Sequence, residues 1–215
     1  MLSESESSWV EVYLRPRYPE LVEGYVEARG IVFSAQSTKH LATVDVQRLV
    51  AMAQSERKPL GENVSCMLGE LAVSFPQAQD ALRQLALSPA AHCRINALAA
   101  LDSFPPSALH FELIERLLQD KSTKVRALAA SKALSCGARG LLSALGSAIE
   151  REKNPELRAE LEWNRSLLRD GYISTTREDG SVWVTCRRGG GVISASFPAD
   201  QFESKGRQWI AENVR

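Results

Sequence analysis

The sequence of 215 residues has no excess charge of either sign and no long apolar run. Its 26 Lys and Arg residues balance 26 Asp and Glu residues, so no overall electrostatic field attracts nucleic acid or an anionic membrane. No apolar segment approaches the ~20 residues that a membrane span needs, and the polar, acidic N-terminus does not resemble a secretory signal. With 44% hydrophobic and 24% charged residues, the composition is that of a soluble globular protein, which we expect to be cytoplasmic.

Cysteine and histidine are also scarce. The four cysteines form no Cys-x-x-Cys pair and have no histidine at ligand spacing, which predicts reduced, buried thiols rather than a zinc site or a disulfide. None of the three histidines has a serine, cysteine or carboxylate at the spacing of a catalytic motif. The sequence therefore predicts a protein without a metal, a cofactor or a catalytic site. The residues concerned are Cys66, Cys93, Cys136, Cys186, His40, His92 and His110.

The middle of the chain contains an internal repeat with a period of 32 residues. Arginine recurs at Arg94, Arg126 and Arg158, and the loop before each arginine carries Ser88, Asp120 and Glu152. Apolar residues recur in the same frame: Leu85, Leu117 and Ile149; Cys93, Val125 and Leu157; Ala97, Ala129 and Leu161. One period earlier the frame is weaker, where Ala53, Glu56 and Pro59 fit and Glu62 replaces the arginine.

Each period is predicted to form two helices. In the best example an amphipathic helix covers about 106–119, a turn follows at 120–123, and an alanine-rich helix covers about 125–134. Gly137 and Gly140 end this inner helix and start the next pair. A single pair of helices cannot cover its own apolar faces, so neighbouring pairs have to stack.

The segment Leu117-Leu118-Gln119-Asp120-Lys121-Ser122-Thr123-Lys124-Val125-Arg126-Ala127-Leu128-Ala129-Ala130 is similar to the HEAT-repeat family in its short bacterial form. The resemblance covers about residues 44–170 and implies a mostly α fold, an armadillo-like α-α superhelix (solenoid). Members of the family are mostly protein-binding scaffolds, with a minority of nucleic-acid binders and a few enzymes. The resemblance also implies a structural ladder between adjacent turns, formed by the repeated arginine and the acid before it. The alternative for these arginines is an anion-binding stripe. The ladder residues are Arg94, Arg126, Arg158, Asp120 and Glu152.

If the inner helices line a concave face, the positions opposite their buried side are exposed on it. This predicted surface is mixed in charge and lacks the cationic trough that a DNA backbone requires, so it suits a polypeptide partner with Trp163 as an anchor. The alternative is that Trp163 and Leu167 pack against the C-terminal segment. The predicted partner-binding residues are His92, Lys124, Ser131, Ser135, Glu156 and Trp163, and Ala99, Ser103 and Leu167 share their face.

The two ends of the chain depart from the repeat. We interpret residues 1–54 as an N-terminal helical cap, with a strand or a helical turn at 9–14 and helices at about 19–29 and 43–53. Residues 55–170 hold the HEAT-like repeats. Residues 171–215 are predicted to form a β-β-β-α appendage, docked on the last repeat because it is too small to be stable alone. Its strands are expected at 172–176, 182–186 and 192–197, and its helix at about 198–214.

A glycine-rich segment in this appendage, Arg187-Arg188-Gly189-Gly190-Gly191, invites comparison with a phosphate-binding loop. It lacks the Lys-Ser/Thr pair and the following helix of such a loop, and it lies between two predicted strands. We therefore interpret it as a hairpin turn, whose basic pair is free to contact an acidic partner.

The preferred function is a non-catalytic protein-interaction module of the adaptor, assembly-factor or toxin-neutralising type. The alternative is a nucleic-acid-binding HEAT-like protein related to the HEAT-like alkylpurine DNA glycosylases, for which Glu160 and Glu162 beside Trp163 are the only hint. Neighbouring acids in Glu-Leu-Glu cannot share one face of a helix, and no basic cleft is apparent. Nucleic acid is therefore not the expected partner.

Overall fold

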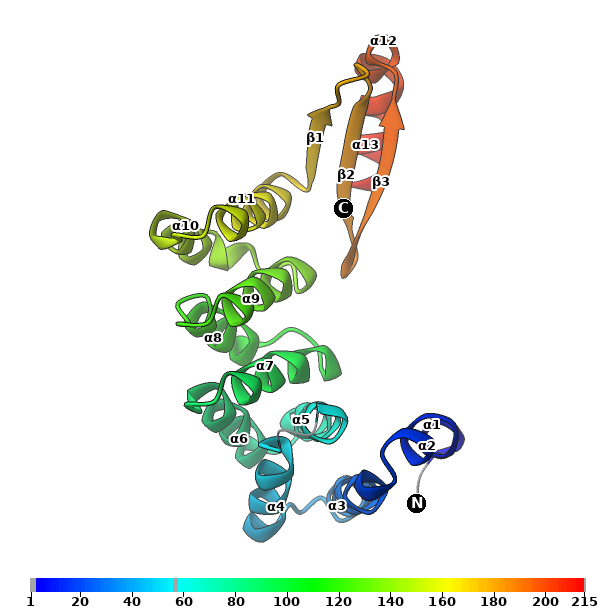
Figure 1. Cartoon of the computed structure of the whole chain (residues 1–215), viewed down its shortest axis with the longest axis vertical. Coiled ribbons are helices and arrows are strands. Elements are labelled where there is room, and N and C mark those ends of the chain that lie inside the picture. Colours follow the sequence, from blue (N-terminus) through cyan, green and yellow to red (C-terminus); the bar gives the residue numbers. More distant parts are fainter. Residues whose placement is uncertain (1–2, 56–57, 215) are drawn as a thin grey trace. The chain divides into compact units, whose positions relative to one another are not determined.

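The computed structural model describes residues 3–55 and 58–214. The chain is mostly helical, with a small antiparallel sheet of three strands near the C-terminus (Figure 1). It divides into two compact units, Met1–Leu113 and Ile114–Arg215. The boundary between the two units, after Leu113, lies inside the segment 55–170 that is predicted to hold the repeats. The division into the segments 1–54, 55–170 and 171–215 rests on the sequence alone. Glu56, a weak member of the repeat frame, lies outside the described residues.

The first unit is built from helices, and α8 crosses into the second. The segment 9–14 is helical, so the strand alternative is wrong; Val10 and Leu14, one helical turn apart, are both buried. The third helix runs nine residues past the predicted end at about Arg29, because Ala28, Val32 and Ala35 continue its buried stripe. The elements are α1 Glu4–Trp9, η1 Val10–Leu14, α2 Arg15–Arg17, η2 Pro19–Leu21, α3 Val22–Thr38, α4 Thr43–Ala53, α5 Lys58–Ala72, α6 Pro76–Leu87, α7 Ala91–Ala99, η3 Ala100–Ser103 and α8 Ala108–Leu117.

The second unit continues with helices α9 Thr123–Ser135, η4 Arg139–Leu141, α10 Leu142–Arg151 and α11 Pro155–Asp170. Helix α11 packs against both α9 and α10. Two of the repeat's apolar columns are buried in both units, as the sequence frame predicts: Cys93, Val125 and Leu157, and Ala97, Ala129 and Leu161. Helix α9 ends close to its predicted position, where Gly137 has a φ of 64° that glycine adopts without strain.

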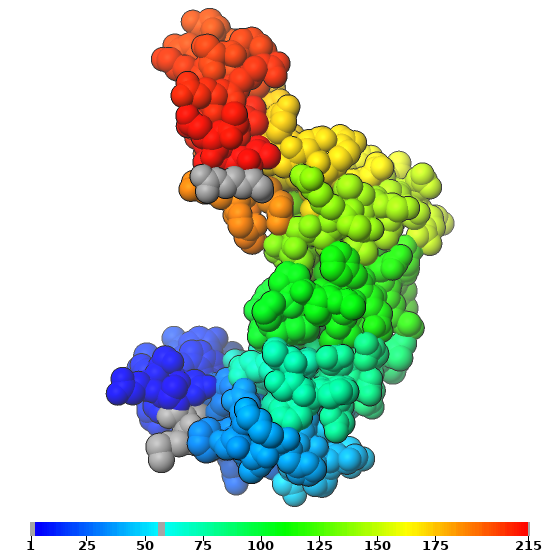
Figure 2. Space-filling model, turned by 180° about the vertical axis from the view of Figure 1, so that it is seen from behind, coloured from blue at the N-terminus to red at the C-terminus, as the bar shows by residue number. Residues whose placement is uncertain are grey.

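The sheet and the last helices confirm the predicted β-β-β-α order. The strands are β1 Tyr172–Thr176, β2 Val182–Arg188 and β3 Gly191–Phe197, antiparallel in the order β1-β2-β3. The buried face of β2, Val182, Val184 and Cys186, is covered by apolar side chains that include Phe202, Trp209 and Ile210. Phe202 belongs to η5 Phe202–Gly206, and Trp209 and Ile210 belong to α13 Arg207–Asn213; the short helix α12 Ala199–Gln201 precedes them. Strands β1 and β2 pack against α11, and Figure 2 shows the orange and red C-terminal segment in contact with this yellow helix.

None of the described helices is both long enough and apolar enough to cross a membrane.

Candidate functional site

The loops that precede α7, α9 and α11 share one backbone arrangement. Each repeated arginine donates to the backbone carbonyl of the residue six positions before it: Arg94 to Ser88 at 2.8 Å, Arg126 to Asp120 at 2.8 Å and Arg158 to Glu152 at 3.1 Å. The side chain of the same loop residue accepts the backbone N–H two positions later: Ser88 from Ala90 at 3.3 Å, Asp120 from Ser122 at 2.7 Å and Glu152 from Asn154 at 2.9 Å. The 32-residue period is therefore a period of hydrogen bonds as well as of apolar residues.

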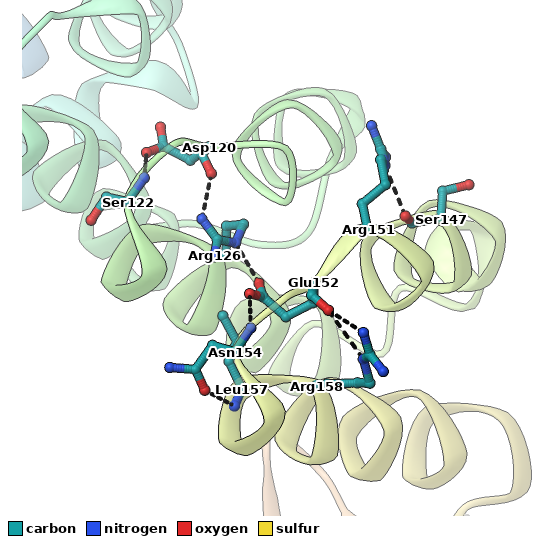
Figure 3. A network of polar contacts seen from close by, with 9 residues as sticks. All are labelled: Asp120, Ser122, Arg126, Ser147, Arg151, Glu152, Asn154, Leu157 and Arg158. Carbon is teal, nitrogen blue, oxygen red and sulfur yellow. Dashed lines mark hydrogen bonds and ion pairs between the residues drawn. The ribbon is translucent and has the colours of Figure 1, made fainter.

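One ion pair connects two successive loops in the second unit (Figure 3). Nε of Arg126 lies 2.7 Å from Oε2 of Glu152, and the two side chains are 18% and 3% exposed. The hydrogen bond from Arg126, together with the backbone N–H of Asn154, lowers the pKa of the Glu152 carboxyl below its ordinary value, although burial opposes the shift. Arg126 thus joins the loop before α9, through the Asp120 carbonyl, to the loop before α11, through a buried carboxylate.

A cleft of about 250 Å³ lies over this ion pair. Its polar lining mixes both signs of charge, with Arg126, Arg151 and Lys153 beside Asp120 and Glu152. Nε of Arg151 donates to the Ser147 carbonyl at 2.9 Å. An incoming anion would have to compete for Arg126 with the Glu152 carboxylate and the Asp120 carbonyl, and for Arg151 with the Ser147 carbonyl.

The lowered pKa of Glu152 gives a stability effect that depends on pH. A carboxyl whose pKa is lower in the folded chain stabilises the fold above its unfolded pKa, near 4.5, and loses that contribution as pH falls through the folded pKa. We expect the free energy of unfolding of wild type to exceed that of Glu152→Gln by about 1–2 kcal/mol at pH 7, and this difference to shrink as pH falls below 4.5. Urea titrations of both proteins across this range measure the gap, and a gap that is independent of pH would contradict the ion pair.

A second cleft, of about 270 Å³, lies between α9, α11 and the turn from β2 to β3, and we call it the hairpin cleft. It brings together three of the predicted partner-binding residues, Ser131, Ser135 and Trp163. The other lining residues are Leu134, Glu160, Asn164, Gly190, Gly191 and Val192. Sequence reasoning missed the hairpin's contribution, because nothing in the local pattern says that the glycine turn at 189–190 returns to α9.

Two large apolar side chains are exposed in the hairpin cleft, Trp163 at 38% and Val192 at 45%. Leu167, expected on the same face, is completely buried, so its predicted exposure is wrong. A helical wheel treats α11 as isolated, whereas the folded helix also packs against β1 and β2. Trp163 keeps the exposure that an anchor residue needs.

The other predicted partner-binding residues lie outside the hairpin cleft. Lys124 and Glu156 are exposed in the first turns of α9 and α11. His92 belongs to the first unit, where its Nε2 lies 3.0 Å from the backbone oxygen of Gln54. Of the two acids beside Trp163, Glu160 lines the cleft, and Glu162 is exposed without being among the lining residues.

Arg187 holds the hairpin against the ends of α9 and α11. Its Nε donates to the Leu134 carbonyl at 2.9 Å, and its backbone N–H donates to the Gly171 carbonyl at 2.8 Å. A Cβ atom on Gly137 would collide with the Arg187 guanidinium, so glycine there makes room for it. The neighbouring Arg188 donates to the side-chain oxygen of Asn213 at 3.2 Å. The glycine-rich segment is thus a hairpin turn, as predicted, and both of its arginines have partners within the chain.

Cys93 and Cys186 are buried, as predicted, whereas Cys66 and Cys136 are only half-buried, and none of the four forms a disulfide within the described residues. Burial raises the pKa of the Cys66 and Cys186 thiols, which disfavours the reactive thiolate. Within residues 3–55 and 58–214, no three His, Cys, Asp or Glu side chains are grouped so that they could hold a metal ion.

Comparison of this chain with models of known families, with curated proteins and with solved structures found no match.

Proposed function

We propose that this chain is a non-catalytic protein-interaction module of HEAT-like, armadillo-like type, which binds a polypeptide partner in the hairpin cleft. The observation that carries the proposal is the exposure of Trp163 in a cleft that two helices and a β-hairpin form together. Exposed aromatic residues in concave sites are typical anchors of protein interfaces. A surface of this kind suits an adaptor, an assembly factor or a toxin-neutralising protein.

The HEAT-like assignment is supported by the repeated loops. In three loops 32 residues apart, an arginine side chain donates a hydrogen bond to the backbone carbonyl six residues earlier. In each loop the side chain of that earlier residue also accepts the backbone N–H two residues later. The apolar columns that follow them are buried between helices. Coincident hydrogen bonds and apolar columns are what a stack of equivalent helix pairs requires.

The lining of the hairpin cleft favours a polypeptide over nucleic acid. Trp163, Val192 and Leu134 supply apolar surface, and Ser131, Ser135 and Asn164 supply hydroxyl and amide groups around it. None of the described residues that line the cleft is Lys or Arg, so it offers no cation to a phosphate. The repeated arginines already donate to carbonyls of their own loops, which argues against their use as an anion-binding stripe.

Trp163→Ala is expected to weaken partner binding by about 30-fold, the effect of losing an aromatic anchor worth about 2 kcal/mol. The partner is first isolated by affinity capture of the tagged chain from its host lysate, with and without nuclease, and its affinity is then measured by calorimetry. Phe33→Ala, which removes an aromatic side chain 54% exposed on α3 of the other unit, is the matched control and should bind as wild type does.

Two results would contradict the proposal. Equal affinities of Trp163→Ala and wild type would remove the hairpin cleft as the binding site. Capture that nuclease abolishes, with a steep dependence on salt, would favour the nucleic-acid alternative instead.

A further inference from the structure

Strand β3 forms one edge of the three-stranded sheet, and its outer side is uncovered in the ribbon view (Figure 1). The other edge strand, β1, packs against α11. Edge strands carry backbone N–H and C=O groups that a further strand can pair with, and proteins commonly protect them with charged side chains, proline or bulges. Over its seven residues, Gly-Val-Ile-Ser-Ala-Ser-Phe, β3 has no charged residue and no proline, and its pairing with β2 is continuous without a bulge.

The register identifies which backbone groups of β3 point outward. Residues of an antiparallel strand alternate, each directing both backbone groups to one side or the other. The N–H of Arg187 donates to the carbonyl of Gly171, just before β1. The backbone N–H and C=O groups of the odd-numbered residues of β2 therefore point toward β1, and those of the even-numbered residues point toward β3. Their partners across the ladder are Ile193, Ala195 and Phe197, which therefore bond inward.

The outward groups belong to Val192, Ser194 and Ser196. Their side chains stand on the face opposite the buried Val184 and Cys186, and all three residues are exposed. Within the described part of the chain, no hydrogen bond from another element reaches their backbone N–H or C=O groups. They present a row of unused donors and acceptors in extended geometry.

The sequence of β3 is complementary to itself in the antiparallel direction. A second β3 centred on Ser194 pairs all seven residues and places the outward residues opposite one another, Ser194 on Ser194 and Val192 on Ser196. In this register each larger side chain meets a small one: Val192 meets Ser196, Ile193 meets Ala195 and Phe197 meets Gly191. No charge lies opposite a like charge. An unrelated peptide would have to supply this match, whereas a second copy brings it.

We infer that the outer edge of β3 binds β3 of a second copy of this chain, in an antiparallel pair centred on Ser194 that joins two sheets into one of six strands. Backbone hydrogen bonds of the three outward residues hold the pair, and the alternation of large and small side chains sets its register. The contact is small, so the dimer is weak and depends on concentration.

Sedimentation equilibrium of the full chain from micromolar to near-millimolar concentration tests this inference. Wild type should shift from monomer to dimer. Ser194→Pro removes an outward N–H and leaves the ladder with β2 intact, so it should abolish dimerisation. Ser194→Ala is the matched control, because it loses the hydroxyl and its bond to Thr185 but keeps the N–H, and it should still dimerise.

A charge exchange keeps the test valid if the proline variant misfolds. Ser194→Asp and Ser194→Lys each place like charges opposite one another in a pair of identical chains and should dimerise several-fold more weakly than wild type. Mixed in equal amounts, they place opposite charges together and should form a heterodimer more stable than either homodimer. A wild type that stays monomeric at near-millimolar concentration would overturn the inference and leave the edge to a foreign strand. Dimerisation that none of these substitutions alters would overturn it as well.

Discussion

Replacing Arg126 by alanine is expected to lower the free energy of unfolding by about 3 kcal/mol. The substitution leaves the Glu152 carboxylate, whose side chain is 3% exposed, without its cation, and it removes the donor to the Asp120 carbonyl. A buried charge that loses its partner costs more than the ion pair contributes when intact, because the carboxylate remains desolvated. Urea denaturation at pH 7, followed by circular dichroism, measures the change.

Arg83→Ala is the matched control for this experiment. Arg83 also contacts two carboxylates, Asp80 and Glu112, but these side chains are 75% and 50% exposed and stay hydrated when the arginine is removed. The expected loss is within about 1 kcal/mol. In the Arg126→Ala background, Glu152→Gln should recover part of the lost stability, since it removes the unpaired charge. An unchanged midpoint for Arg126→Ala would show that this arginine is free for a ligand and would revive the anion-binding alternative.

Gly69→Ala is expected to destabilise the first unit by about 2 kcal/mol, although alanine is the better helix former. Gly69 lies within α5, where that helix packs against η3. A Cβ atom there would collide with the backbone oxygen of Ala100 and lie 3.0 Å from Cβ of Ser103. The obstacle is main chain rather than a flexible side chain, so the two elements have to separate.

Gly30→Ala supplies the opposite result in the same unit. Gly30 lies within α3, is exposed, and has nothing within 4 Å of the position that a Cβ would occupy. Here the helix propensity of alanine acts alone and should stabilise the fold by about 0.5–1 kcal/mol. Denaturation midpoints of the two variants should therefore move in opposite directions. A Gly69→Ala variant as stable as Gly30→Ala would contradict the close approach of α5 and η3.

The candidate site was only partly predictable from the sequence. Helical spacing places Ser131 and Ser135 on one face of α9, and both line the hairpin cleft with Trp163. The same reasoning failed for Leu167, which is buried. Spacing along one helix says which residues share a face, but it does not say which neighbour covers that face.

The sequence by itself determined the mostly helical character, the 32-residue period and the β-β-β-α end of this protein. These features follow from local patterns, namely apolar residues at helical spacing and an Asp-Gly turn at 179–180 between two β-prone segments. Strand β1 Tyr172–Thr176, for example, has the bounds that the sequence predicts. Only the tertiary structure decided that the β2–β3 turn meets α9 to form the hairpin cleft. It also decided which contact of the expected ladder forms an ion pair, that of Arg126 with the carboxylate of Glu152, 26 residues away. Contacts between distant segments depend on how whole elements pack against one another, and no window of neighbouring residues contains that information.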